Sequence, residues 1–271
     1  MPLKCVYTDL DGTLLGRGGA LFRDSEGHFS MSQARALEAC HRAGVEVVVM
    51  SGRREAQVLE DARLMGQDSY IYEAGCAFVI GGETTVMSGA MAPGPERTIY
   101  QQMEDRGLPR ILFEHFDSRL EYHSPWHTER EHSHLFRGAV DVEEANRVLA
   151  ERGHGDDVRL LDNGAISRTM PGIETVHAYH LVPRMVSKAA AVGAHARARG
   201  YGREECIAVG DSVEDLGVAA VVGRFFLVAN GPERDPGLRA ALAEPDNVTV
   251  TEGRMGEGFY QAVVSTLMEG R

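Results

Sequence analysis

Two aspartates separated by a single residue lie near the N-terminus, in the sequence DLDGT at positions 9–13. A carboxylate can attack phosphorus and form an aspartyl-phosphate, which makes Asp9 a candidate nucleophile. The carboxyl group of Asp11 could protonate a leaving oxygen and later accept a proton from water. Gly12 allows the backbone to turn tightly after this pair. The segment therefore predicts phosphoryl-transfer chemistry.

A calcium-binding loop is one structural alternative for this segment. An EF-hand loop carries a glutamate at its twelfth position. Counted from Asp9 or from Asp11, that position is Ala20 or Phe22, so the calcium-loop interpretation fails. A solvated turn is the other alternative for the DLDG sequence taken alone.

Polar residues also follow a second apolar run, at residues 45–50. Ser51 and Gly52 offer a hydroxyl group and an unhindered backbone amide at the start of a predicted helix, and such groups suit a phosphate oxygen. Taken alone, Ser51 is more simply explained as a helix N-cap.

Acidic residues follow a third apolar run, in the sequence GDSVED at 210–215. Asp211 and Asp215 lie across a strand-to-helix junction, where they could bind one hard cation or orient its ligands. The alternative is a helix N-terminus with acidic residues, which is common. Lys188, near the start of another predicted helix, would by itself be an ordinary surface lysine.

Alternating strand and helix patterns separate these segments, which is typical of a parallel sheet with helices on its faces. In such sheets ligands bind at the carboxyl ends of the strands, where three of the four segments are expected. We therefore predict an α/β fold with a Rossmann-like parallel-sheet core and helices on both faces. The predicted strands are residues 3–8, 45–50, 206–209, 225–228 and 248–250, and the predicted helices lie near residues 32–44, 56–64, 187–199, 213–220 and 255–268.

The middle of the chain has a different composition. A Pro-Gly-Pro sequence at 93–95 breaks the pattern, and from there to about residue 183 the apolar runs are weaker. We predict an inserted α+β domain at residues 85–183, within a discontinuous core of residues 1–84 and 184–271. Its predicted strands are residues 111–113, 135–140, 158–161 and 175–179, and its predicted helices lie near 95–106 and 142–152.

Taken in this order, the four segments resemble the four motifs of the haloacid dehalogenase superfamily. The inserted domain resembles the large α/β cap of its Cof-type sugar-phosphate phosphatases, and the resemblance extends over nearly the whole chain. The DLDGT sequence is its most specific part. The sequence YEAG at 72–75 resembles the family's Glu-Asn-Gly stretch, with Ala74 in place of the asparagine, and VANG at 228–231 resembles its last active-site turn.

The resemblance implies a magnesium-dependent phosphatase in which Asp9 is the nucleophile and Asp11 the general acid and base. It implies that Mg²⁺ binds Asp9, Asp211 and the backbone carbonyl of Asp11, with Asp215 as a ligand or a supporting partner. A cation is also needed on physical grounds, because several carboxylates cannot all stay ionised beside a phosphate dianion. The residues implied for phosphate binding are Ser51, Gly52, Lys188 and Asn230.

Glu214 occupies a position where these phosphatases usually carry asparagine. A carboxylate cannot donate a hydrogen bond unless it is protonated, and an ionised one facing the phosphate would repel it. We therefore expect Glu214 to turn outward on the first turn of its helix, where a negative charge is favourable.

The cap is expected to act as a lid that excludes water and recognises the leaving group of the substrate. Four residues close to the return of the chain into the core are candidate substrate contacts. They are Arg168, Thr169, His177 and His180.

Composition limits the partners. The chain of 271 residues has a formal net charge of −12 and no Lys/Arg-rich run. We therefore expect neither nucleic acid nor an anionic membrane as a partner, since both need a basic face. The N-terminal segment lacks the shape of a signal peptide, and no apolar run approaches the length of a membrane span. We expect a cytoplasmic protein.

The sequence thus predicts a phosphomonoesterase for a small phosphorylated metabolite, such as a sugar phosphate. Sucrose-phosphate, mannosyl-phosphoglycerate and phosphoglycolate phosphatases have similar layouts, so the substrate stays open, as does the oligomeric state. The alternative is a non-catalytic or regulatory phosphate-binding protein on the same fold, for which Glu214 is the main indication.

Overall fold

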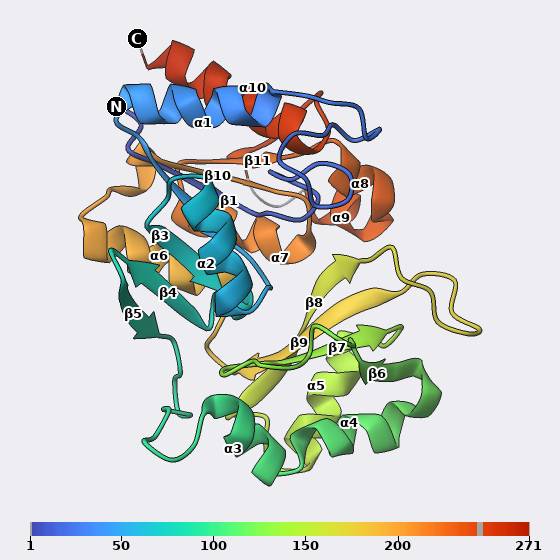
Figure 1. Cartoon of the computed structure of the whole chain (residues 1–271). Coiled ribbons are helices and arrows are strands. Elements are labelled where there is room, and N and C mark those ends of the chain that lie inside the picture. Colours follow the sequence, from blue (N-terminus) through green and yellow to red (C-terminus); the bar gives the residue numbers. More distant parts are fainter. Residues whose placement is uncertain (1, 243–245, 271) are drawn as a thin grey trace.

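The computed structural model describes residues 2–242 and 246–270, and it contains a large and a small β-sheet (Figure 1). The large sheet has eight strands in the order β12-β11-β10-β1-β2-β3-β4-β5. The β3–β4 and β4–β5 pairs are antiparallel, and the other pairs are parallel. Its strands are β1 Cys5–Thr8, β2 Glu46–Met50, β3 Ser69–Tyr72, β4 Ala77–Ile80, β5 Glu83–Val86, β10 Cys206–Gly210, β11 Arg224–Leu227 and β12 Val248–Val250.

Helices cover both faces of this sheet, because its central strands alternate apolar side chains to each side. Val6 of β1 packs with α1, α2 and α10, whereas Cys5 and Tyr7 pack with the helices of the opposite face. The predicted α/β core with helices on both faces is therefore confirmed. The first layer is α1 Ser32–Ala43, α2 Glu55–Leu64 and α10 Met255–Glu269; the second includes α6 Lys188–Arg199, α7 Val213–Leu216 and α9 Pro236–Ala241, with α8 Asn230–Arg234 between α7 and α9 in the chain.

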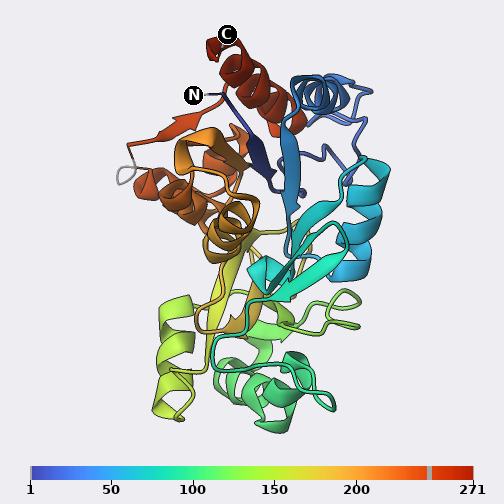
Figure 2. The same cartoon turned by 90° about the vertical axis from the view of Figure 1, so that its left-hand side faces the viewer.

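The small sheet is antiparallel, with the order β6-β7-β9-β8, and it belongs to the inserted cap. Three helices pack on the face that points away from the core, which leaves the other face toward it (Figures 1 and 2). The strands are β6 Leu120–Tyr122, β7 His134–Gly138, β8 Val158–Ala165 and β9 His177–Pro183, and the helices are α3 Ile99–Asp105, α4 Leu108–Phe116 and α5 Val142–Glu151.

Two details of the predicted cap are wrong. Residues 111–113 form part of α4 and not a strand, because Leu108, Leu112 and Phe116 recur at the helical period and bury one face. The expected boundary at residue 84 falls inside β5, which belongs to the large sheet and continues to Val86. Within the described ranges, no helix combines the length and apolar character that crossing a bilayer requires.

Candidate functional site

The carboxyl ends of three neighbouring strands bring the predicted motifs together. β1 lies between β2 and β10, and all three run in parallel. Asp9, Ser51 and Asp211 each follow directly after one of these strands. Their side chains line a single cavity of about 1100 Å³ between the core and the cap, together with Lys188 and Asp215. The prediction that the four segments meet at one site is consistent with this arrangement.

Lys188 is buried at the start of α6, so the interpretation as a surface lysine is wrong. Its Nζ donates to Asp9 Oδ1 at 2.8 Å and to Asp215 Oδ1 at 2.7 Å. Burial alone would lower the pKa of Lys188, but Asp215, Asp9 and Glu214 together raise that pKa well above its usual value. The ammonium group is therefore a fixed positive charge at the floor of the cavity.

Three carboxylates form the acidic centre of the site. Asp9, Asp211 and Asp215 each offer an oxygen, and these oxygens lie within 4.8 Å of one another. Burial raises the pKa of Asp9 well above its usual value, against the opposing effect of Lys188. Burial and the neighbouring Asp215 raise the pKa of Asp211 to about 7. Clustered oxygen ligands with excess negative charge fit a hard divalent cation such as Mg²⁺.

Asp215 also organises the backbone of this acidic centre. Ser212 is the N-cap of α7, and Asp215 Oδ2 accepts from the Ser212 hydroxyl at 2.7 Å and from the Asp211 backbone N–H at 3.2 Å. Since Oδ2 is engaged in this way and Oδ1 accepts from Lys188, Asp215 holds Asp211 and Lys188 in place.

The Asp11 side chain lies apart from this cluster and is half exposed. Both of its oxygens accept from Arg53, with Nε–Oδ2 at 2.7 Å and Nη2–Oδ1 at 2.6 Å. Arg53 also contacts Asp61 at 2.6 Å. Sequence reasoning did not assign Arg53 to the site, although its position directly after Ser51 and Gly52 was a signal that could have done so.

The backbone of the loop after β2 is held from two sides. The Ser51 carbonyl accepts from the Ala74 N–H at 3.0 Å, and the Gly52 carbonyl accepts from Arg130 Nη2 at 2.6 Å. A Cβ atom on Gly52 would lie only 2.7 Å from His180 Nε2, so the close approach of the cap requires glycine. Arg130 is a cap residue that sequence reasoning missed.

Asn230 does not line the cavity, contrary to its expected role in phosphate binding. Its Nδ2 donates to the Gly12 carbonyl at 2.9 Å, and its Oδ1 accepts from the Met255 N–H at 2.7 Å. Because both ends of the amide are engaged by the backbone, Asn230 fixes the turn after Asp11 and supports the site from behind.

The expectation that Glu214 turns outward is wrong. Its side chain is only 5% exposed, and its Oε2 lies 3.8 Å from Lys188 Nζ. Neither carboxylate oxygen has a hydrogen-bond partner within the described part of the chain. Burial raises the pKa of Glu214 to about 7. The short helix α7 packs against β8 of the cap, which closes off the solvent that an outward side chain would need.

Of the four cap residues expected to contact substrate, Arg168 and His180 line the cavity, whereas Thr169 and His177 do not. Thr169 is exposed on the loop that follows β8. His177 has the same parity along β9 as Tyr179, whose side chain packs in the cap core, and its Nδ1 lies 2.8 Å from Asp162 Oδ2. Side chains alternate between the two faces of a strand, so residues 177 and 180, three positions apart, are expected on opposite faces. This rule could have excluded His177 as a substrate contact once His180 was chosen.

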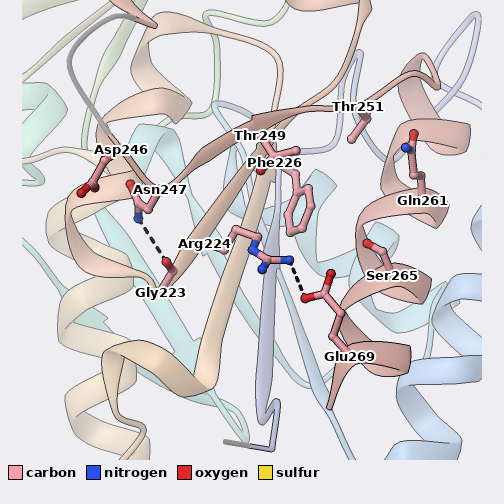
Figure 3. A pocket seen from close by; sticks show the side chains of 10 residues that line it. All are labelled: Gly223, Arg224, Phe226, Asp246, Asn247, Thr249, Thr251, Gln261, Ser265 and Glu269. Atoms are coloured by element: carbon pink, nitrogen blue, oxygen red, sulfur yellow. Dashed lines mark hydrogen bonds and ion pairs between the residues drawn. The ribbon is translucent and has the colours of Figure 1, made fainter. Parts of the chain in front are cut away.

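A second cavity, of about 530 Å³, lies beside β11, β12 and α10 (Figure 3). Arg224 and Glu269 form an ion pair at 2.9 Å at its edge, and Asn247 Nδ2 donates to the Gly223 carbonyl at 3.3 Å. Among the residues that the structure describes, it shares no lining residue with the cavity that holds the predicted motifs.

Comparison with known proteins decides the family. The model of the haloacid dehalogenase-like hydrolase family matches residues 6–152, which include the DLDGT sequence and the loop after β2. The chain belongs to the haloacid dehalogenase-like hydrolases. Membership confirms the resemblance inferred from the four motifs.

Relatives within the haloacid dehalogenase-like hydrolases are phosphatases. The chain is 27% identical to a phosphoglycolate phosphatase of Methanoculleus marisnigri over 272 aligned positions, which cover 96% of this chain and 95% of the relative. It is also 27% identical to a phosphoglycolate phosphatase of Archaeoglobus fulgidus, with the same coverage. The chain is accordingly a phosphoric monoester hydrolase.

Solved structures share this fold. The sucrose-phosphatase of Synechocystis sp. PCC6803 superimposes with a TM-score of 0.68 at 15% identity and 98% coverage of both chains. The Thermoplasma acidophilum protein 0175 superimposes with a TM-score of 0.65 at 18% identity and full coverage of both chains. At these identities the likeness concerns the core and the cap and not the substrate.

Proposed function

We propose that this chain is a magnesium-dependent phosphomonoesterase that acts on a small phosphorylated metabolite through an aspartyl-phosphate on Asp9. The observation that carries the proposal is the contact of Lys188 with Asp9 Oδ1 at 2.8 Å. It fixes the carboxylate at the floor of the cavity, and in the described part of the chain Oδ2 makes no hydrogen bond. An oriented carboxylate with one unengaged oxygen is suited to attack phosphorus.

In the first half of the proposed reaction, a bond forms between Asp9 Oδ2 and phosphorus while the bond from phosphorus to the leaving oxygen breaks. Lys188 and the loop of Ser51 and Gly52 stabilise the negative charge on the phosphoryl oxygens. Asp11 gives its proton to the leaving oxygen, so that an alcohol departs.

In the second half, water attacks phosphorus, Asp11 takes a proton from that water, and the bond between phosphorus and Asp9 breaks. Inorganic phosphate leaves, and the Asp9 carboxylate is restored. Both Asp11 oxygens accept from Arg53 in this arrangement. Proton transfer by Asp11 therefore requires at least one of these hydrogen bonds to be released.

Mg²⁺ would be held by Asp9 and Asp211, with Asp215 beside them, and when bound it compensates the charge of the carboxylates and the phosphate. Burial and, after it, the charge of Asp215 raise the pKa of Asp211 to about 7, and a bound cation would oppose this rise. Thr13 Oγ1 donates to Asp211 Oδ1 at 3.3 Å, which helps to orient this carboxylate.

2-Phosphoglycolate is our first candidate substrate, because relatives that align along almost the whole chain are named phosphoglycolate phosphatases. Proteins that are 27% identical can differ in the leaving group of their substrates, so a panel of phosphomonoesters is tested together with 2-phosphoglycolate.

The test is hydrolysis of para-nitrophenyl phosphate with Mg²⁺ and with EDTA. We expect activity that EDTA removes and Mg²⁺ restores, and an Asp9→Asn variant that is folded but at least about a thousandfold slower, because an amide is a poor nucleophile. Near-normal turnover by a folded Asp9→Asn protein would contradict the mechanism. Absence of hydrolysis across the panel would contradict the proposed function.

A further inference from the structure

The two walls of the main cavity differ in charge. Among the described residues that line it, the carboxylates of Asp9, Asp11, Asp211, Asp215 and Asp235 all come from the core. The described residues of the cap wall include no carboxylate. Its titratable lining residues are His123, Arg130, Arg168 and His180. The core wall thus combines carboxylates with cations and suits a metal ion and a phosphate, whereas the cap wall offers only cations and neutral polar groups among the described residues. The cations of the core wall are Arg17, Arg53, Lys188 and Arg234.

Polar atoms of the cap wall have unused hydrogen-bonding capacity. His180 is 1% exposed, and its Nδ1 has no partner within the described residues. Both ring nitrogens of His123 are buried and equally unpartnered there. Burial lowers the pKa of His123 to about 4 and that of His180 well below its usual value. These rings are therefore neutral near pH 7, and the charge of this wall comes from its arginines.

The two arginines of this wall differ in how far they are engaged. Arg130 donates to Gly52, Ser133 and Trp126, so its guanidinium group is used inside the protein. The guanidinium of Arg168 lies 4.6 Å from the centre of the Trp126 ring. No hydrogen bond or ion pair engages Arg168 within the described ranges. Stacking fixes one face of a guanidinium group and leaves its N–H edges free to bind.

Trp126 connects Arg168 to His123. The His123 and Trp126 rings meet edge to face, with centroids 5.1 Å apart. A Cβ atom on Gly52 would contact His180 Nε2, so His180 lies directly over the loop of Ser51 and Gly52. The cap wall therefore extends from the proposed phosphate-binding loop to Arg168, which is stacked on Trp126 and makes no hydrogen bond or ion pair with the described residues.

We propose that this wall, with Arg168 as its charge and His123 and His180 as its hydrogen-bonding groups, binds a carboxylate on the leaving group of the substrate. The inference rests on the proposed phosphatase function. A guanidinium edge matches the two oxygens of a carboxylate. A second phosphate group would bring nearly two negative charges, whereas Arg168 is the one unengaged cation among the described residues of this wall. A neutral polyol would leave the guanidinium group of Arg168 without a counter-charge.

The experiment compares two substrates that differ only at the distal group. 2-Phosphoglycolate carries the carboxylate, and 2-hydroxyethyl phosphate replaces it with a hydroxymethyl group. We expect Arg168→Met to lower kcat/KM for 2-phosphoglycolate by about 10- to 100-fold, the effect of losing a charged hydrogen bond, and to change kcat/KM for 2-hydroxyethyl phosphate less than about threefold. Arg168→Lys keeps the charge but loses the planar guanidinium group. Its kcat/KM for 2-phosphoglycolate should fall between those of the wild type and Arg168→Met.

The matched control is Arg110→Met, which removes an exposed cap arginine that is paired with Glu114 outside the cavity. This variant should leave kcat/KM unchanged for both substrates. Equal losses for the two substrates in Arg168→Met, or a wild-type enzyme that does not prefer 2-phosphoglycolate, would overturn the carboxylate site while leaving the phosphatase intact. A wild-type protein that hydrolyses neither substrate nor para-nitrophenyl phosphate would instead overturn the proposed function.

Discussion

At the scale of single residues, the site is organised around one buried lysine. Lys188 contacts Asp9 and Asp215 at hydrogen-bonding distance and Glu214 at 3.8 Å. Three carboxylates around one ammonium group leave an excess of negative charge. Burial raises the pKa of Glu214 to about 7. Glu214 is the carboxylate of this group that lies farthest from the ammonium nitrogen, and it makes no hydrogen bond within the described residues.

The first residue-scale prediction concerns Glu214→Gln, which keeps the shape and removes the charge. Between its unfolded pKa of about 4.3 and its folded pKa of about 7, Glu214 binds more protons in the folded than in the unfolded state, so its contribution to stability falls as pH rises. The variant should therefore gain Tm relative to wild type at about pH 8 and gain less at about pH 5.

Activity should change less than about tenfold in Glu214→Gln, since Lys188 keeps its two closer partners. Tm by calorimetry and kcat/KM on para-nitrophenyl phosphate are the measurements. A loss of kcat by more than about a hundredfold would instead show that the carboxylate has a positive task in the reaction.

At the scale of elements, the loop between β6 and β7 is fixed to the core by a buried charge pair. Glu73, directly after β3, accepts from the backbone N–H of Glu131 at 3.0 Å and from the Ser133 hydroxyl at 2.7 Å. Arg130 Nε lies 3.7 Å from Glu73 Oε2, and the same guanidinium donates to Gly52. Movement of the cap at this loop therefore acts on the turn of Ser51 and Gly52, where we propose that the phosphate binds.

Arg130→Met should destabilise the protein by about 3 kcal/mol, because it leaves the Glu73 carboxylate buried without its cation. It should also raise KM, since the Gly52 carbonyl loses the donor that orients this turn. The Glu73→Gln/Arg130→Met double variant should recover part of the lost stability. Urea unfolding of the two single variants and the double variant measures this coupling.

Arg54→Met is the matched control, because Arg54 pairs with Glu129 of the same loop at the surface. This variant should lower the free energy of unfolding by less than about 1 kcal/mol. Strict additivity of the Glu73 and Arg130 effects would show that the two side chains do not act as a pair.

At the scale of the whole molecule, the acidic centre links stability to pH and, in the proposed function, to Mg²⁺. The pKa of Asp211 is about 7, against about 3.9 for an unfolded aspartate. Between these values the metal-free folded protein holds the extra proton, so the contribution of Asp211 to stability falls as pH rises. In the proposed site, Mg²⁺ would bind the deprotonated carboxylate and compete with that proton.

We therefore expect Mg²⁺ to raise Tm more at about pH 8 than at about pH 5.5, relative to EDTA-treated protein. Differential scanning calorimetry with Mg²⁺ and with EDTA at each pH is the measurement. In the Asp211→Asn variant, most of the Mg²⁺-dependent rise in Tm should be lost at both pH values. Equal shifts of wild type at the two pH values would argue against Asp211 as the titrating ligand.

Local patterns in the sequence were sufficient for the α/β core and for the position of its motifs. Alternating apolar strands and helices are set by neighbouring residues, and parallel pairing then places Asp9, Ser51 and Asp211 at one edge of the sheet. The cap was recognised as a separate α+β unit, although α4 was mistaken for a strand. These features depend on periodicity over a few residues, which is readable without coordinates.

Burial and long-range partners were decided only by the tertiary structure. Glu214 lies inside because β8 of the cap packs on α7, and Arg130 reaches Gly52 across 78 positions of the chain. Asn230 turned inward to the backbone, although its sequence context suggested the phosphate. In each case a partner far away in the sequence fixes the solvent access and charge around the side chain, and no local pattern records which distant segment will pack there.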